Sequence, residues 1–183
     1  GSGSWRADLI RRHAEAIERT IVEAADVGVQ QAFNAFAALG RYLSTEEPAM
    51  FQRILRRLPE PVPESLLTDS DRFSWAEIYF EAARLQGANT PRLQAKALAL
   101  YEAEVRPQRF HLQRRAELLI DMGRPAEGEA LLREREDLET SEWIQRLMAR
   151  ARLAQDDAPN ALIWINKALE RLKAKHFRSE FLE

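Results

Sequence analysis

Histidines and carboxylates are the side chains of this chain that could carry acid, base or metal chemistry, and their spacing argues against such chemistry. The histidines His13, His111 and His176 lie on three separate segments, and none has a second histidine four residues away. A zinc site or an activated general base needs such neighbours. We interpret His13 as a half-buried filler on the apolar side of its helix. The carboxylates of residues 134–139 alternate with arginines, which is typical of a solvated helix end.

Other catalytic patterns are also absent from the sequence. It has seven glycines, and they form neither a phosphate-binding loop nor a nucleophile elbow. We therefore predict a protein that is not an enzyme, with no catalytic residue, no metal and no cofactor. We also predict no small-molecule substrate.

The charges are nearly balanced, with 27 basic and 29 acidic residues and a net charge of -2. This balance gives no global reason to expect nucleic acid as a partner. A basic end could meet phosphate or an acidic partner, but cations are also favoured at a helix C-terminus by the helix dipole. That basic end consists of Lys167, Arg171, Lys173, Lys175, His176 and Arg178.

No stretch approaches the about 20 consecutive apolar residues of a membrane span, and no signal-peptide pattern is present. We expect a cytoplasmic chain, with the periplasm left open because a chain without cysteine fits both compartments. Residues 1–4, Gly-Ser-Gly-Ser, have the composition of a tag remnant. In that case the chain is a part of a longer protein.

Apolar residues recur at three- and four-residue steps along most of the chain, which is the helical period. The pattern predicts helices over residues 5–25, 29–43 and 48–58, with a capping box from Ser44 to Glu47 at the start of the third. It then predicts six more, over residues 73–86, 91–105, 109–122, 125–137, 141–155 and 158–175. No alternating run is long enough for a strand, so the predicted fold is all-α.

Pro59, Pro61 and Pro63 interrupt the helical pattern, because proline lacks an amide donor and biases its predecessor toward extended geometry. We predict a proline-rich linker over residues 59–70. It would separate a three-helix N-terminal part, residues 1–58, from helical hairpins over residues 71–183. The linker is too short to demand two independent domains.

Two segments, Leu112–Leu132 and Gln145–Ile165, repeat the same plan of helix, turn and helix 33 residues apart. A period of this length is typical of stacked helical hairpins, which bury their apolar faces against each other and leave a surface for a partner. We expect close helix approach at Ala116, Ala149 and Ala161. At the 33-residue offset, small residues and turn formers coincide: Ala116 with Ala149, Gly128 with Ala161, and Gly123 with Asp156.

These segments resemble the tetratricopeptide repeat family, whose repeat of about 34 residues is a helical hairpin. The resemblance covers residues 73–175 and implies a short solenoid of antiparallel hairpins. Arg135 and Arg152 depart from it, because alanine and a large apolar residue are usual there. Another antiparallel helical array is the alternative. The matching residues are Leu112, Ala116, Leu119, Gly123, Gly128 and Leu132, then Ala149, Ala161, Ile165 and Ala168, and before them Trp75, Phe80, Gly87, Ala95 and Pro107.

The resemblance implies a concave groove lined by residues of the first helix of each hairpin. Trp5, Trp75 and Trp164 fall on apolar stripes and are predicted in the core, whereas Trp143 falls on the groove face. The alternative is that this face is solvated or covered by the N-terminal helices. The predicted partner-binding residues are Glu77, Glu81 and Arg84, then Phe110, Gln113 and Glu117, then Trp143, Arg146 and Arg150.

Arginine and aromatic side chains on one surface suit a peptide with carboxylates and an apolar anchor. We therefore expect a non-catalytic scaffold that binds a partner peptide or domain. The alternative is an accessory or oligomerising helical domain of a larger bacterial enzyme or polysaccharide-assembly protein, and a homo-oligomer stays open. The sequence does not separate these two functions.

Overall fold

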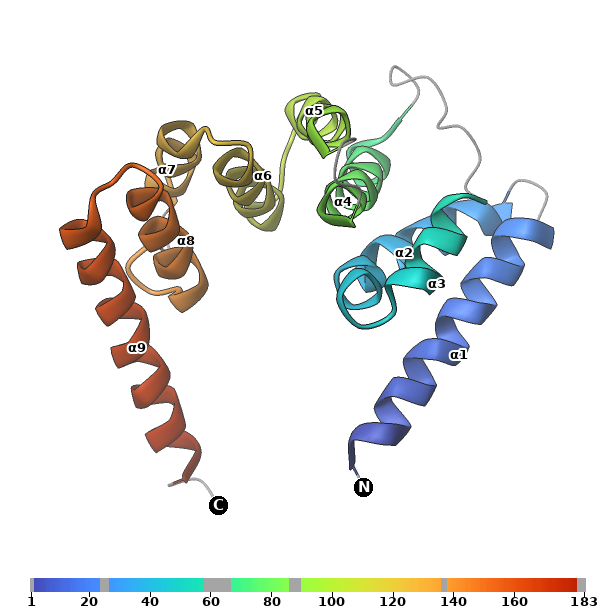
Figure 1. Ribbon diagram of the computed structural model, residues 1–183, viewed down its shortest axis with the longest axis horizontal. Coiled ribbons are helices and arrows are strands. Elements are labelled where there is room, and N and C mark those ends of the chain that lie inside the picture. Colours follow the sequence, from blue (N-terminus) through green and yellow to red (C-terminus); the bar gives the residue numbers. More distant parts are fainter. Residues whose placement is uncertain (1, 24–26, 58–66, 86–89, 136–137, 181–183) are drawn as a thin grey trace. The chain divides into compact units, whose positions relative to one another are not determined.

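The computed structural model describes residues 2–23, 27–57, 67–85, 90–135 and 138–180, which form nine α-helices and no strand (Figure 1). The prediction of an all-α fold is confirmed. Among these residues, no helix is long and apolar enough to cross a membrane. The helices are α1 (Ser2–Glu23), α2 (Val27–Glu46), α3 (Pro48–Leu55), α4 (Asp69–Leu85), α5 (Thr90–Glu102), α6 (Arg109–Asp121), α7 (Pro125–Arg133), α8 (Glu142–Leu153) and α9 (Ala158–Glu180).

The chain forms two compact units, residues 1–106 (unit 1) and residues 107–183 (unit 2). The boundary between them falls at Arg106 and Pro107, whereas the sequence pattern placed its division at residues 59–70. Most of that predicted linker lies outside the described residues. On either side of it, α2 and α3 pack against α4, so the three N-terminal helices and the first hairpin after the prolines belong to unit 1.

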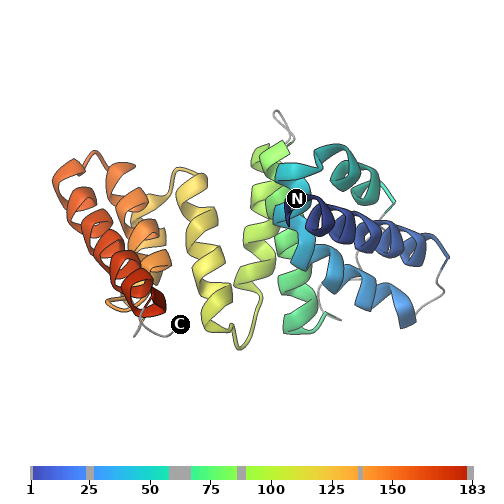
Figure 2. The same cartoon turned by 90° about the horizontal axis from the view of Figure 1, so that it is seen from below.

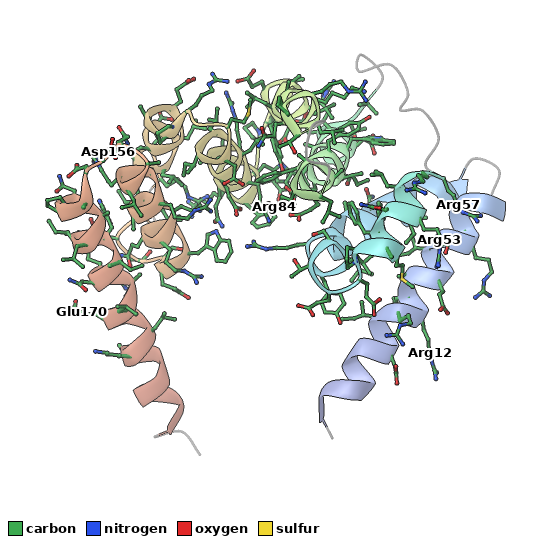
Figure 3. The ribbon with its side chains drawn as sticks, in the orientation of Figure 1. Arg12, Arg53, Arg57, Arg84, Asp156 and Glu170 are labelled. Carbon is green, nitrogen blue, oxygen red and sulfur yellow. The ribbon has the colours of Figure 1, made fainter. Side chains whose placement is uncertain are left out.

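In unit 1, α2 lies at the centre and contacts α1, α3 and α4. Its apolar side carries Phe36 and Leu43, which are fully buried. The ring of Phe36 stacks on that of Phe51 from α3, with 5.0 Å between the ring centroids. The opposite flank of α3 is tied to α1 by ion pairs in which Arg53 and Arg57, labelled in Figure 3, share the carboxylate of Glu18 at 2.8 and 3.2 Å.

Two local predictions in unit 1 are wrong. Ser44 does not cap α3: α2 continues through it to Glu46, and its hydroxyl donates a hydrogen bond of 2.8 Å to the buried carboxylate of Glu81 on α4. A buried carboxylate needs such a donor, which outweighs the capping role. His13 is exposed on α1 rather than half-buried, because Ala14 and Ile17 form the buried side of that helix.

The start of α4 is fixed by hydrogen bonds that the sequence pattern did not reveal. Thr68 and Asp71 form a reciprocal cap, in which the Thr68 amide donates to the Asp71 carboxylate at 3.0 Å and the Asp71 amide to the Thr68 hydroxyl at 3.2 Å. Asp69 accepts the amides of Val105 and Arg106, each at 3.0 Å. These two bonds lower the pKa of Asp69. They also attach the chain that follows α5 to the first turn of α4.

Unit 2 consists of two hairpins, α6 with α7 and α8 with α9, which Figure 1 and Figure 2 both show as adjacent pairs. The helices α6 and α8 begin 33 residues apart, and so do α7 and α9. The first helices contact each other, and α7 also contacts α8. Their shared core includes Ala116, Leu132, Ile144, Met148 and Trp164.

The turns inside the two hairpins have the same backbone conformation. Gly123 has φ 74° and Asp156 has φ 59°, both in the left-handed region. After each of them, an amide reaches back across the helix end, from Arg124 to the carbonyl of Leu119 and from Asp157 to that of Arg152, both at 2.9 Å. This is the Schellman arrangement that ends helices at a left-handed residue. The 33-residue echo therefore extends to the backbone.

We predict that Gly123→Ala destabilises the protein by on the order of 1 to 2 kcal/mol, because an alanine pays the left-handed backbone cost. A Cβ at Gly123 meets no atom within 4 Å, so the cost is purely conformational. Asp156→Gly, the matched variant, changes stability by less than about 1 kcal/mol, since the relief of backbone strain is offset by a more flexible unfolded chain. Urea unfolding measures both, and equal stability of Gly123→Ala and the parent contradicts the assigned turn.

The helices α6 and α7 approach each other closely at Gly128, where an added Cβ would lie 2.8 Å from the carbonyl oxygen of Ala116. We predict that Gly128→Ala costs about 1 to 3 kcal/mol through overpacking. Gly40, within α2, is the matched control, because a Cβ there would lie 3.5 Å from its nearest neighbour, an ordinary contact. Gly40→Ala should therefore gain up to about 1 kcal/mol from helix propensity. Thermal unfolding that shifts both variants in the same direction would refute this packing.

Candidate partner-binding surface

The nine predicted partner-binding residues divide between the two units, with Glu77, Glu81 and Arg84 on α4 in unit 1 and the other six on α6 and α8 in unit 2. Each set is therefore placed within its own unit. A surface that runs across both sets stays a prediction.

In unit 1 the predicted face of α4 is largely covered. Glu77 is buried and accepts a hydrogen bond from the hydroxyl of Tyr101 on α5. Glu81 is 1% exposed beneath α2, where it accepts the hydroxyl of Ser44. For Glu81, the structure therefore agrees with the alternative in which the N-terminal helices cover this face. Both carboxylates therefore accept hydrogen bonds in the interior of unit 1.

Arg84 is the one residue of this set whose side chain reaches solvent. Its guanidinium lies 3.4 Å from the Glu81 carboxylate and 4.7 Å from the centre of the Phe80 ring. Figure 3 labels it at the end of α4. An arginine held over an aromatic ring keeps its planar donors oriented, and Arg84 already has an acidic partner on its own helix.

In unit 2, Phe110 and Trp143 occupy the same position, the second residue of α6 and of α8. The α8 helix starts there because the Ser141 side chain accepts the Ile144 amide at 3.4 Å. Phe110 is 52% exposed. Trp143 is half-buried against the core of unit 2, and the guanidinium of Arg146 lies 4.8 Å from the centre of its ring. The two aromatics therefore differ in how much of the ring they present to solvent.

The predicted residues Glu117 and Arg150 are brought together by the packing of α6 against α8. Glu117 is 1% exposed and is paired with the buried Arg114 of its own helix. Arg150 lies 3.6 Å from Glu117 and 2.5 Å from Asp121. This network joins the two first helices. Glu117 is buried, whereas Arg146 and Arg150 are exposed and Gln113 is half-buried.

Arg152, which departs from the repeat pattern, has a role that the resemblance did not suggest. It pairs with the buried Glu129 of α7 and, at 3.0 Å, with Asp157. Glu129 also accepts Arg133 at 2.6 Å and the Gln155 amide at 2.8 Å. In the sequence, the available signal was the carboxylate of Glu129, three residues before Leu132, together with Arg152 in the next repeat. This network fixes α8 against α7.

Lys167 and Arg171, two residues of the basic end predicted from the sequence, line a small open cavity of about 230 Å³ on unit 2. Lys167 there pairs with Glu139 at 3.0 Å, and Gln145 donates to the Glu139 carbonyl at 3.1 Å. One basic side chain of this cavity is therefore already paired with an acidic one. It is lined by Glu139, Gln145, Lys167, Glu170, Arg171 and Ala174.

Within the described ranges, no group of three or more histidine, aspartate or glutamate side chains could hold a metal ion. Comparison with protein-family models, with curated proteins and with solved structures finds no match to this chain. The resemblance to tetratricopeptide repeats therefore stays a prediction from the sequence.

We predict an acid-sensitive contribution from Glu129. Burial alone would raise its pKa, but hydrogen bonds from Gln155 and Arg133 and the charge of Arg152 outweigh burial and hold the pKa below its usual range. The folded state therefore gains stability above the unfolded pKa of about 4.3, and loses it as pH falls through the lower folded pKa. Glu129→Gln should cost about 1.5 to 3 kcal/mol at pH 7, and this difference should shrink on acidification.

Denaturant unfolding at neutral and acidic pH measures this difference. Glu170→Gln, an exposed position on α9 labelled in Figure 3, is the control and should leave the pH dependence unchanged. A Glu129→Gln difference that is independent of pH contradicts the assignment.

Proposed function

We propose that this protein is a non-catalytic interaction scaffold, built from tetratricopeptide-like stacked hairpins, that binds a partner peptide or domain. Three observations in unit 2 support the proposal. The hairpins begin 33 residues apart, their turns share the left-handed conformation, and α8 contacts both helices of the preceding hairpin. Stacked hairpins of this kind present their first helices as a binding surface.

The observation that carries the proposed binding site is the exposed ring of Phe110 at the start of α6. An aromatic ring that is half in water adds little to stability, and aromatic side chains flanked by arginine are common binding hot spots. Trp143 with Arg146 stands at the equivalent place on α8, which adds a partly exposed ring and a cation. We expect the partner segment to carry an apolar or aromatic anchor and one or more carboxylates.

We predict that peptides selected from a random displayed library against the whole chain share an acidic residue close to a large apolar one. Phe110→Ala should raise the peptide Kd at least about tenfold, which corresponds to about 1.4 kcal/mol. Its unfolding free energy should change by less than about 1 kcal/mol, because the ring is exposed. Fluorescence anisotropy with a labelled peptide measures the Kd.

Two further variants sharpen this experiment. Arg146→Glu should weaken binding through charge repulsion with the peptide carboxylate. Leu153→Ala, at the opposite end of α8 and 62% exposed, removes a comparable apolar side chain away from the site and should leave the Kd unchanged. Selected peptides that bind Phe110→Ala and Arg146→Glu as tightly as the parent would refute this surface.

The alternative, an oligomerising part of a larger enzyme or polysaccharide-assembly protein, draws support from a separate surface on α9.

A further inference from the structure

One side of α9 exposes a regular row of large apolar residues, which we call the α9 stripe: Leu162, Ile165, Leu169 and Leu172. Leu162, Leu169 and Leu172 are 59%, 47% and 42% exposed, and Ile165 is half-buried. The neighbouring side of the helix, with Ala161, Trp164 and Ala168, is buried in unit 2. At about 100° per residue, the four side chains fall within one narrow sector next to that buried side.

The preceding hairpin shows what normally covers this sector. At the 33-residue offset, Leu162 and Ile165 correspond to Glu129 and Leu132 of α7. Glu129 is 5% exposed and Leu132 is fully buried, because α8 packs on them. The α9 stripe is therefore the face on which a further helix would stack.

The spacing of the apolar residues in the stripe favours a second copy of this chain as the partner. Successive members are three, four and three residues apart, so the row reads the same in both directions. When two identical helices pack antiparallel, Leu162 of one lies opposite Leu172 of the other, and Ile165 lies opposite Leu169. A twofold axis near Lys167 thus matches every apolar residue with an apolar residue. Such self-complementarity is what an isologous dimer requires.

The charges at the two ends of α9 favour the same antiparallel arrangement. Asp156 and Asp157 precede the helix, whereas Lys173 lies in its C-terminal part. Figure 3 labels Asp156 at the turn between α8 and α9. Antiparallel pairing brings each acidic start towards the part of the other copy's helix that carries Lys173, and it aligns the two helix dipoles favourably. Parallel pairing would place the two acidic starts together.

We propose that two copies of this chain form a symmetric dimer through antiparallel packing of their α9 stripes. The stripe belongs to α9, whereas Phe110 and Trp143 belong to α6 and α8, so the proposed dimer does not rest on the proposed peptide binding.

The oligomeric state of the full chain tests the dimer. Light scattering coupled to gel filtration should give twice the chain mass of 21.1 kDa, with dissociation on dilution. Leu169→Lys should raise the dimer dissociation constant at least about tenfold, because each interface contains the substitution twice. Ile163→Lys is the matched control: Ile163 is 54% exposed on the same helix but lies outside the stripe sector. Circular dichroism establishes that both variants keep their helices.

Single-cysteine cross-linking tests the direction of the pairing, since the chain has no cysteine of its own. Asn166 flanks the stripe close to the twofold axis, so Asn166→Cys should join two copies through a short bismaleimide. Lys173 lies on the same flank but six residues from the axis, so in an antiparallel pair the two Lys173→Cys thiols are about 18 Å apart along the helices. That variant should not cross-link.

A monomeric chain at all concentrations, as expected if the stripe binds a helix of another protein, would overturn the proposal. So would a dimer that Leu169→Lys leaves intact, or one that Ile163→Lys weakens equally. Equal cross-linking through Asn166→Cys and Lys173→Cys would mean parallel helices and would overturn the antiparallel arrangement. Loss of peptide binding in Phe110→Ala with an unchanged dimer would separate the two surfaces.

Discussion

The backbone of unit 2 reverses at Gly123 and again at Asp156. These two left-handed residues pair the helices of unit 2 into hairpins. Because each reversal comes directly after a first helix, the second helix returns along it at a separation small enough for Gly128 to approach the Ala116 carbonyl. A short hairpin of this kind cannot bury both of its faces. It therefore presents one side to the next hairpin, which places Phe110 and Trp143 at equivalent starts of α6 and α8.

Buried carboxylates are the second theme of the structure. Glu77, Glu81, Glu117 and Glu129 are each less than a tenth exposed, and each has a hydrogen-bond or ion-pair partner on its own or a neighbouring helix. Burying an ionised group is costly unless it is paired in this way. Three of the four had been predicted to face a partner. They instead join helices to each other.

The sequence determined the helices well because their signal is periodic and local. The nine predicted helices correspond to α1 to α9, and the 33-residue offset holds for the starts of both hairpins in unit 2. Trp75 and Trp164 are buried as predicted; the side chain of Trp5 lies outside the described residues. The wrong prediction at Ser44 came from an interaction between segments distant in sequence. Ser44 has the spacing of a cap, but the buried carboxylate of Glu81 takes its hydroxyl, and periodicity carries no information about that choice.

The pairing of Glu129 with Arg152 also constrains how the array can grow. One repeat earlier, the position of Arg152 is occupied by Leu119, and one repeat later, that of Glu129 is occupied by Leu162. If the hairpin of α6 and α7 were duplicated in tandem, the inserted Leu119 would face Glu129 and leave a buried carboxylate without its arginine. The pairing of Glu129 with Arg152 therefore favours the observed order of the hairpins. Lengthening this array by simple duplication would carry an electrostatic penalty that a uniform apolar interface would not impose.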